Sequence, residues 1–357
     1  MFSEIERKII NGERLNREEA LFLFKSEDLH RIGELAEEVS KKINQNRVYF
    51  IVNRHINPTN ICVNRCRFCA FSRTKGEPDA YEMTIKEIVK NLKEAKQSLD
   101  YLSEVHIVSG LHPDWQFEHY LDIIQQIKKE FPSIGVKAFT AVEVDYFSRI
   151  SGLSIEETLI RLKEAGVDIM PGGGAEIFNS DVRAKICPEK ISGERWLEII
   201  KTAHSLGIKT NATMLYGHVE SYEDRVDHLL RLRELQDETG GFIAFIPLSY
   251  QPENTQIKVS YPSGIDDLKT IAISRLVLDN IPHIKAYWIM LGEKLAQLAL
   301  LFGADCLEGT VIEERIAHAA GARSKKGNTI EELVYLIKEV GKLPVERDSF
   351  YNIKRTF

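Results

Sequence analysis

The chain has 357 residues, 43% hydrophobic and 28% charged, a balance that excludes disordered and collagen-like classes and allows a large buried core. It has no apolar run of the roughly 20 residues that a membrane helix needs, and its net charge of -6 does not favour a nucleic-acid partner. The charged first ten residues lack a signal-peptide core, and five cysteines are an odd number, so we expect reduced thiols in the cytoplasm.

The first 46 residues predict helices. Asn16 and Glu19 form a capping-box pattern, in which each residue bonds the backbone of the other. Apolar residues at helical spacing follow as far as Ile43. We expect residues 1–46 to form a helical extension without chemistry and residues 47–357 to form the main domain.

After residue 46, short β-type runs alternate with amphipathic helices, which is typical of a parallel sheet. Eight such units over about 280 residues favour a (β/α)8 barrel, and an open doubly wound sheet is the alternative. Capping boxes start helices at Thr84 and Ser154, and a further helix starts at Ser192. The predicted strands are 48–52, 105–108, 136–141, 167–170, 210–214, 242–247, 284–290 and 305–307.

Polar residues at the carboxyl ends of these strands are the candidates for a functional site, because barrel chemistry lies at that end. They fall in six segments: 54–60, 109–114, 143–145, 172–176, 216–220 and 249–254.

Three cysteines follow the first predicted strand. Cys62, Cys66 and Cys69 have the spacing C-x3-C-x2-C. Three thiolates can hold three irons of a [4Fe–4S] cube and leave the fourth iron open to a ligand. A structural zinc site usually shows paired ligands, and the sequence has no second pair, so zinc is the weaker alternative. Cys187 and Cys306 stand apart, and we expect them to be buried apolar residues.

The cysteine spacing after the first barrel strand, with Phe68 before the third cysteine, resembles the radical S-adenosylmethionine (SAM) superfamily. The resemblance implies that the amino and carboxylate groups of SAM chelate the fourth iron and that an electron from the cluster cleaves the sulfonium. Segments 172–178, 212–218, 307–310 and 346–348 resemble the aminodeoxyfutalosine synthase group within it, over nearly the whole chain from about residue 47. The cyclic dehypoxanthinyl futalosine synthases and the deazaflavin (FO) synthase subunits share much of this pattern.

The resemblance implies a transferase of menaquinone biosynthesis. Such an enzyme adds the 5′-deoxyadenosyl radical to the enol ether of 3-[(1-carboxyvinyl)oxy]benzoate and yields 6-amino-6-deoxyfutalosine after rearrangement and decarboxylation. A flavodoxin or ferredoxin is the expected reducing partner. The alternatives are a sister enzyme, in which the radical abstracts hydrogen, and a non-catalytic iron–sulfur or zinc scaffold.

The same resemblance implies the cofactor-binding residues. Phe68 is the aromatic residue of the cysteine loop, and the carbonyls of Ser109 and Gly110 suit the ammonium group of SAM. Glu176 suits the ribose hydroxyls or the ammonium, and Arg195 suits the carboxylate. Ser109 stands where a glycine is expected. The alternative for Arg195 is a solvated charge on a helix face.

A substrate with two carboxylates needs cationic or hydrogen-bonding clamps. Arg54 and His55 directly follow the first predicted strand, His112 follows the second, and His218 follows the fifth. We expect Arg54, His55 and His218 to act on the substrate, His218 as a clamp or a proton carrier; a structural role is the alternative for each histidine. Further candidates for the pocket are Tyr250, Gln251, Glu253 and Asn254, and either a tail salt bridge or a substrate contact is expected of Arg347 and Asp348.

Overall fold

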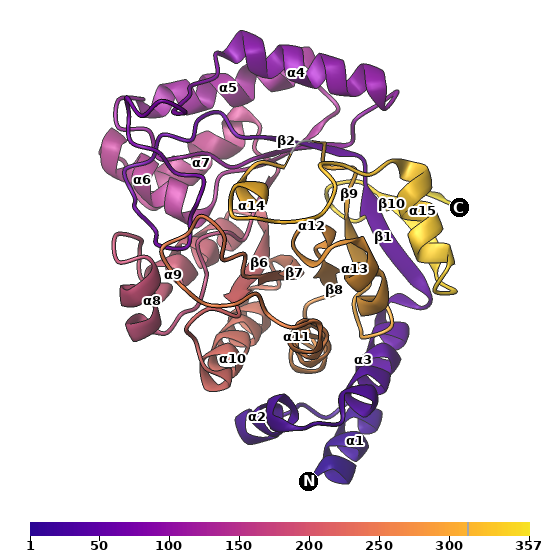
Figure 1. The fold of residues 1–357 in the computed structure, drawn as a ribbon. Coiled ribbons are helices and arrows are strands. Elements are labelled where there is room, and N and C mark those ends of the chain that lie inside the picture. The colour runs from indigo at the N-terminus through magenta and orange to yellow at the C-terminus, as the bar shows by residue number, and fades with distance from the viewer. Residues whose placement is uncertain (313) are drawn as a thin grey trace.

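The strands form one sheet that curls around the centre of the molecule, and most helices surround it (Figure 1). The computed structural model describes residues 1–312 and 314–357. The sheet order is β11-β10-β1-β9-β8-β7-β6-β5-β4-β3-β2, parallel except for the β10–β11 pair. The strands are β1 (Arg47–Ile51), β2 (Asn53–Ile56), β3 (Glu104–Ile107), β4 (Gly135–Ala138), β5 (Ile169–Met170), β6 (Lys209–Tyr216), β7 (Phe242–Ser249), β8 (His283–Ala286), β9 (Cys306–Gly309), β10 (Leu343–Arg347) and β11 (Ile353–Thr356).

The first predicted strand, 48–52, corresponds to β1, and a strand that was not predicted, β2, follows it directly. β1 pairs with β9 and β10, whereas β2 pairs with β3, and only Val52 separates β1 from β2. The amide of Ser103 donates to the carbonyl of Val52 (2.8 Å), and the amide of His55 donates to that of Val311 (3.0 Å). Residues 47–56 therefore bridge the two ends of the sheet, as the predicted barrel requires.

The helices begin where the sequence signals predicted. The side chains of Asn16, Thr84 and Ser154 each complete a capping box, and Ser192 accepts from the first turn of its helix. The helices are α1 (Phe2–Asn11), α2 (Arg17–Lys25), α3 (Leu29–Asn44), α4 (Ile85–Ser98), α5 (Phe117–Glu130), α6 (Ala141–Ser151), α7 (Ile155–Ala165), α8 (Ser180–Ile186), α9 (Gly193–Ser205), α10 (Tyr222–Thr239), α11 (Gly264–Val277), α12 (Trp288–Leu291), α13 (Glu293–Ala299), α14 (Ile316–Ala319) and α15 (Ile330–Lys338).

Two predicted strands end early because a helix begins inside the predicted range. The strand predicted at 136–141 ends at Ala138, since Thr140 and Glu143 form a capping box for α6. The strand predicted at 284–290 ends at Ala286 and is followed by α12. Glu143, expected in a loop, therefore lies in the first turn of a helix at the barrel mouth.

The N-terminal helices pack directly on barrel helices. α2 contacts α10 and α11, and α3 lies along α11 (Figure 1). As a result α11 is buried on all sides from Asp267 to Val277. The division at residue 46 stays a prediction, but the extension shares the core of the barrel.

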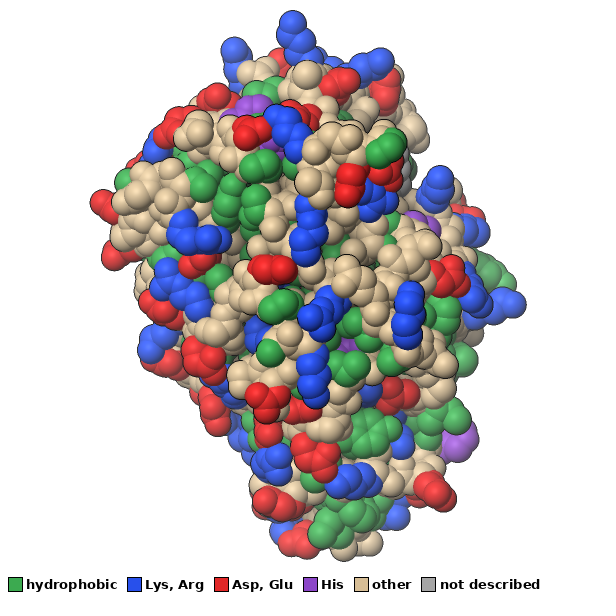
Figure 2. Space-filling view, turned by 60° about the vertical axis from the view of Figure 1, so that its left-hand side comes forward, with side chains coloured by type: hydrophobic (Ala, Val, Ile, Leu, Met, Phe, Trp, Pro, Cys, Tyr) green, Lys and Arg blue, Asp and Glu red, His purple; other side chains and the backbone are tan. Residues whose placement is uncertain are grey.

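One face of the molecule carries Lys and Arg side chains interspersed with Asp and Glu, without a large patch of one sign (Figure 2). Among the described residues, none of the helices has the length and apolar character that a bilayer crossing requires.

Candidate active site

A cavity of about 300 Å³ lies at the carboxyl ends of the barrel strands. Its wall is formed by the loop after β2, by the ends of strands around the barrel and by α14. Eight of the predicted cluster ligands, cofactor-binding residues and catalytic residues line it: His55, Cys62, Cys66, Phe68, Cys69, Ser109, Gly110 and Glu176.

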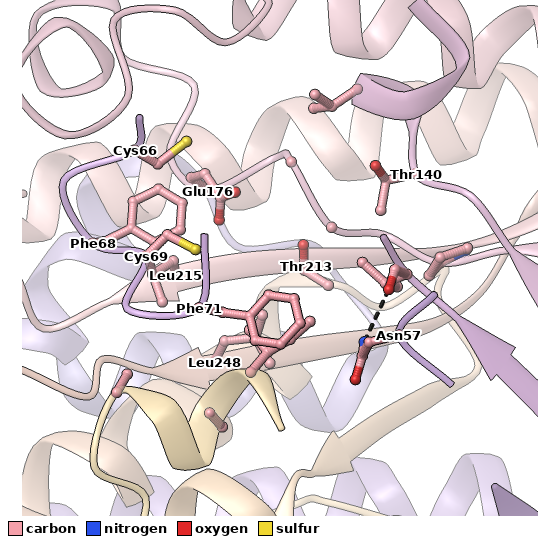
Figure 3. A pocket seen from close by; sticks show the side chains of 18 of the residues that line it. Asn57, Cys66, Phe68, Cys69, Phe71, Thr140, Glu176, Thr213, Leu215 and Leu248 are labelled. Carbon is pink, nitrogen blue, oxygen red and sulfur yellow. Dashed lines mark hydrogen bonds between the residues drawn. The ribbon is translucent and has the colours of Figure 1, made fainter. Parts of the chain in front are cut away.

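The cysteine loop between β2 and α4 is tied to its surroundings through its backbone. The amide of Cys62 donates to the carbonyl of Arg73 (3.0 Å), and the amide of Arg67 donates to the carbonyl of Ile186 at the end of α8 (2.8 Å). Figure 3 shows Cys66 and Cys69 beside Glu176 at one end of the cavity, with Thr213 farther along it. Burial raises the pKa of the Cys62 thiol and raises that of Cys66 to about 12.

The end of β3 lies directly against this loop. A Cβ atom on Gly110 would stand 2.2 Å from the carbonyl oxygen of Ile61, so only glycine fits there. The amide of Ser109 donates to Oε1 of Glu143 (2.9 Å), and the hydroxyl of Ser109 has no hydrogen-bond partner among the described residues. Burial raises the pKa of Glu143 to about 7, although backbone amides donate to its carboxylate.

Glu176 is held in a left-handed backbone conformation, with φ of 46°. Non-glycine residues rarely adopt it, and such strain is concentrated at functional sites. The guanidinium of Arg183 fixes the segment by donating to the carbonyls of Ala175 (2.6 Å) and Ile177 (3.1 Å). The carboxylate of Glu176 is thereby presented to the cavity.

A lysine that the sequence analysis missed completes this end of the cavity. Nζ of Lys190 lies 2.6 Å from Oε1 of Glu176 and 4.9 Å from the ring centroid of Phe68. Burial alone would raise the pKa of Glu176, but the attraction of Lys190 outweighs it and the pKa is lowered. Burial opposes the charge of Lys190, yet Glu176 and the nearby thiols raise its pKa. The pair is therefore ionised.

Comparison with known proteins identifies this architecture. The radical SAM superfamily matches residues 56–232, and the CofH/MqnC C-terminal region matches residues 239–357. The chain is 47% identical to the aminodeoxyfutalosine synthase of Thermus thermophilus, over 99% of this chain and 96% of that protein. This chain belongs to the same family of radical SAM enzymes.

Relatives with other names are also similar. The 5-amino-6-(D-ribitylamino)uracil–L-tyrosine 4-hydroxyphenyl transferase of Methanopyrus kandleri is 44% identical, over 91% of this chain and 89% of that protein. The cyclic dehypoxanthine futalosine synthase of Halalkalibacterium halodurans is 38% identical, over 99% and 95%. Among solved structures, methylornithine synthase matches with a TM-score of 0.77 at 19% identity, over 95% of this chain and 97% of that one, which supports the fold alone.

Radical SAM enzymes use a [4Fe–4S] cluster and SAM, and the cysteine loop of this enzyme offers three thiols on one cavity wall. Among the described residues, no three His, Cys, Asp or Glu side chains are arranged so that they could hold a metal ion. A four-iron cube takes each thiolate on a different iron, so its ligands are spread over a wider site. Cys62, Cys66 and Cys69 line one cavity and lie on one loop, as a cube requires.

Arg195, expected to meet the carboxylate of SAM, does not line the cavity. Its guanidinium lies on α9, about a third exposed, and bonds Asp145 (3.0 Å) and Glu198 (2.9 Å). The cation that lies beside Glu176 is Lys190, and not Arg195. The geometry of Arg195 matches the alternative considered for that residue, a charge on a helix surface.

His218 also lies away from the cavity lining. Its Nε2 donates to the carbonyl of Leu215 (3.0 Å), and its Nδ1 accepts from the amide of Val219 (2.7 Å), if the tautomer follows these partners. Burial lowers its pKa in spite of nearby Glu220. Both ring nitrogens are thus engaged in the turn after β6, which does not support the expected role in substrate binding or proton transfer.

Arg54 and His55 lie inside β2, and not beyond a strand as expected. Successive side chains of a strand point to opposite faces, so His55 reaches the cavity while Arg54 is buried on the other face. His112 is buried, with its Nε2 3.0 Å from Glu82. Of the four cationic candidates, only His55 meets the cavity.

Of the remaining candidates, some line the cavity and others do not. Tyr250 and Gln251 line the cavity, whereas Glu253 and Asn254 do not. Arg347 is buried against the ring of Tyr351, and Asp348 accepts the amides of the tail turn, so this pair fixes the C-terminal strands. The isolated cysteines, Cys187 and Cys306, are buried as expected.

Proposed function

We propose that the enzyme joins the 5′-deoxyadenosyl group of SAM to the enol ether of 3-[(1-carboxyvinyl)oxy]benzoate and releases 6-amino-6-deoxyfutalosine, a step of menaquinone biosynthesis. The observation that carries this proposal is the 47% identity over almost the full length to an aminodeoxyfutalosine synthase. It exceeds the identity to the relatives named for a tyrosine-dependent transfer and for a cyclisation.

Residues of this chain would hold both the cluster and SAM. Cys62, Cys66 and Cys69 would hold the cluster, which supplies the electron that cleaves the sulfonium of SAM. Lys190 would bind the SAM carboxylate and Glu176 its ammonium or ribose, because each offers the opposite charge or the required acceptor. The tight contact at Gly110 keeps the end of β3 against the cluster loop.

The remaining task is to hold the alkene near the adenosyl carbon and to exclude water. The cavity wall is suited to excluding water, because Phe71, Leu215 and Leu248 line it together with other apolar side chains. A flavodoxin or ferredoxin would deliver the electron.

The second candidate is the cyclisation named for the Halalkalibacterium relative. The two reactions differ in the fate of the adenosyl group, which is built into the product in an addition and released as 5′-deoxyadenosine when hydrogen is abstracted.

The test is anaerobic incubation of the holoenzyme with SAM, a reductant and the enol ether, followed by mass analysis. We expect a product that contains the adenosyl group and little free 5′-deoxyadenosine, with no product from the Cys66→Ala variant. Free 5′-deoxyadenosine in stoichiometric amount, without the adduct, would contradict the proposal.

A further inference from the structure

Three side chains form a row across the floor of the cavity. His55, His106 and Lys137 each occupy the last but one position of a strand, in β2, β3 and β4. The sheet register pairs His55 with His106 and His106 with Lys137. All three line the cavity, one layer below Ser109 and the cysteine loop.

Three of the four ring nitrogens of the two imidazoles in this row lack a hydrogen-bond partner among the described residues. Their ring centroids are 4.5 Å apart and the rings are inclined at 71°. Nε2 of His55 and both ring nitrogens of His106 are buried and have no hydrogen-bond partner among the described residues. Buried polar atoms are nearly always satisfied, so unsatisfied ones in a cavity wall point to a ligand that meets them.

Two buried lysines and two buried carboxylates pair beside the row, and the carboxylate of Glu314 also lines the cavity and acts on His55. Nζ of Lys137 lies 2.6 Å from Glu104 and 3.8 Å from Glu308, and Lys285 also pairs with Glu308. Two lysines thus face two carboxylates. Burial lowers the pKa of both imidazoles, so each is neutral and offers one N–H donor. An incoming anion would meet imidazole N–H donors and Lys137, and the paired lysines offset the charges of Glu104 and Glu308.

We propose that His55, His106 and Lys137 form the subsite for the benzoate carboxylate of the substrate. This inference rests on the proposed function, and the substrate's shape selects the carboxylate. The enol-ether carboxylate is attached to the reacting alkene, which must lie at the cluster end of the cavity. The benzoate carboxylate is the substrate's far end, and the row lies on the cavity floor below the cluster loop.

The test compares two probes on the holoenzyme by titration calorimetry: 3-methoxybenzoate, a stable mimic of the aryl ether, and anisole, which lacks the carboxylate. The variants are His55→Phe and His106→Phe, which keep a ring and remove the donors. We expect each variant to weaken 3-methoxybenzoate binding about tenfold or more, the loss expected for a hydrogen bond to a charged group. Anisole binding and SAM affinity should hold.

Equal losses for both probes, or an unchanged preference for the carboxylate, would overturn the subsite. Lys137→Met provides a further measurement, since it removes the cation but leaves the imidazoles in place. This variant also leaves the buried carboxylate of Glu104 without its lysine partner. The histidine variants are therefore the decisive test. If the enol ether is not converted, the proposed function fails. Histidine-dependent binding of 3-methoxybenzoate would then still support the subsite.

Discussion

At the scale of single residues, the strained Glu176 and Lys190 beside it are the pair that we propose to hold SAM. Glu176 is 5% exposed, and its carboxylate would be costly to bury without Nζ of Lys190 at 2.6 Å. Arg195, in contrast, lies on the surface of α9 and forms ion pairs with Asp145 and Glu198. The pair with Glu198 is exposed and contributes little. Asp145 is buried but also pairs with Arg149, so loss of Arg195 should have little effect on SAM binding.

We therefore expect Lys190→Met to weaken SAM binding and Arg195→Met to leave it near normal. A lost charge-assisted hydrogen bond costs about 1.5–3 kcal/mol, or roughly tenfold to a hundredfold in affinity. Equilibrium binding of SAM checks this, and iron content shows whether the cluster loop is intact. Normal affinity in Lys190→Met together with a loss in Arg195→Met would return the role to Arg195.

At the scale of elements, local signals were readable from the sequence and side-chain direction was not. Capping boxes at Asn16, Thr84 and Ser154 depend on residues three apart, and all three are present. His218 and Lys190 lie in loops whose path is set by packing against distant segments. No spacing in the sequence indicates that the ring of His218 bonds its own turn or that Lys190 reaches the cavity.

The cysteine loop itself gives a direct prediction. Changing Cys62, Cys66 or Cys69 to Ala should remove a cluster ligand that the loop cannot replace, so iron content and turnover should collapse. Cys306→Ala is the matched control, because that thiol is buried within β9 and does not line the cavity. Loss of iron in the control, or normal iron in a loop variant, would show the ligand assignment to be wrong.

The contact between β3 and the loop can be tested without touching a ligand. Gly110→Ala would bring a methyl group to 2.2 Å from the carbonyl of Ile61, so the loop must shift. We expect reduced iron content measured after anaerobic reconstitution. Gly264→Ala is the control, since a Cβ atom there would meet the side chain of Leu295 at 3.6 Å, an ordinary contact, and iron content should hold. Full iron in Gly110→Ala would mean that the loop tolerates the shift.

At the scale of the whole molecule, the N-terminal extension covers α11, a helix on the outside of the sheet. Leu23, Phe24, Ile32 and Ala36 are fully buried, as is Ile271 on α11. Each large apolar side chain contributes about 1.5–3 kcal/mol when buried. The ion pairs of Arg14 with Asp237 and Asp279 are exposed and contribute far less.

Apolar burial, and not these ion pairs, therefore attaches the extension. We expect a chain of residues 47–357 to aggregate, because α11 would expose its apolar face, whereas Arg14→Ala in the full chain should remain folded with full iron content. Soluble yield, circular dichroism and iron content of the two proteins check this. If the truncated chain is soluble and retains iron, residues 47–357 fold without the extension, and α11 does not need its cover.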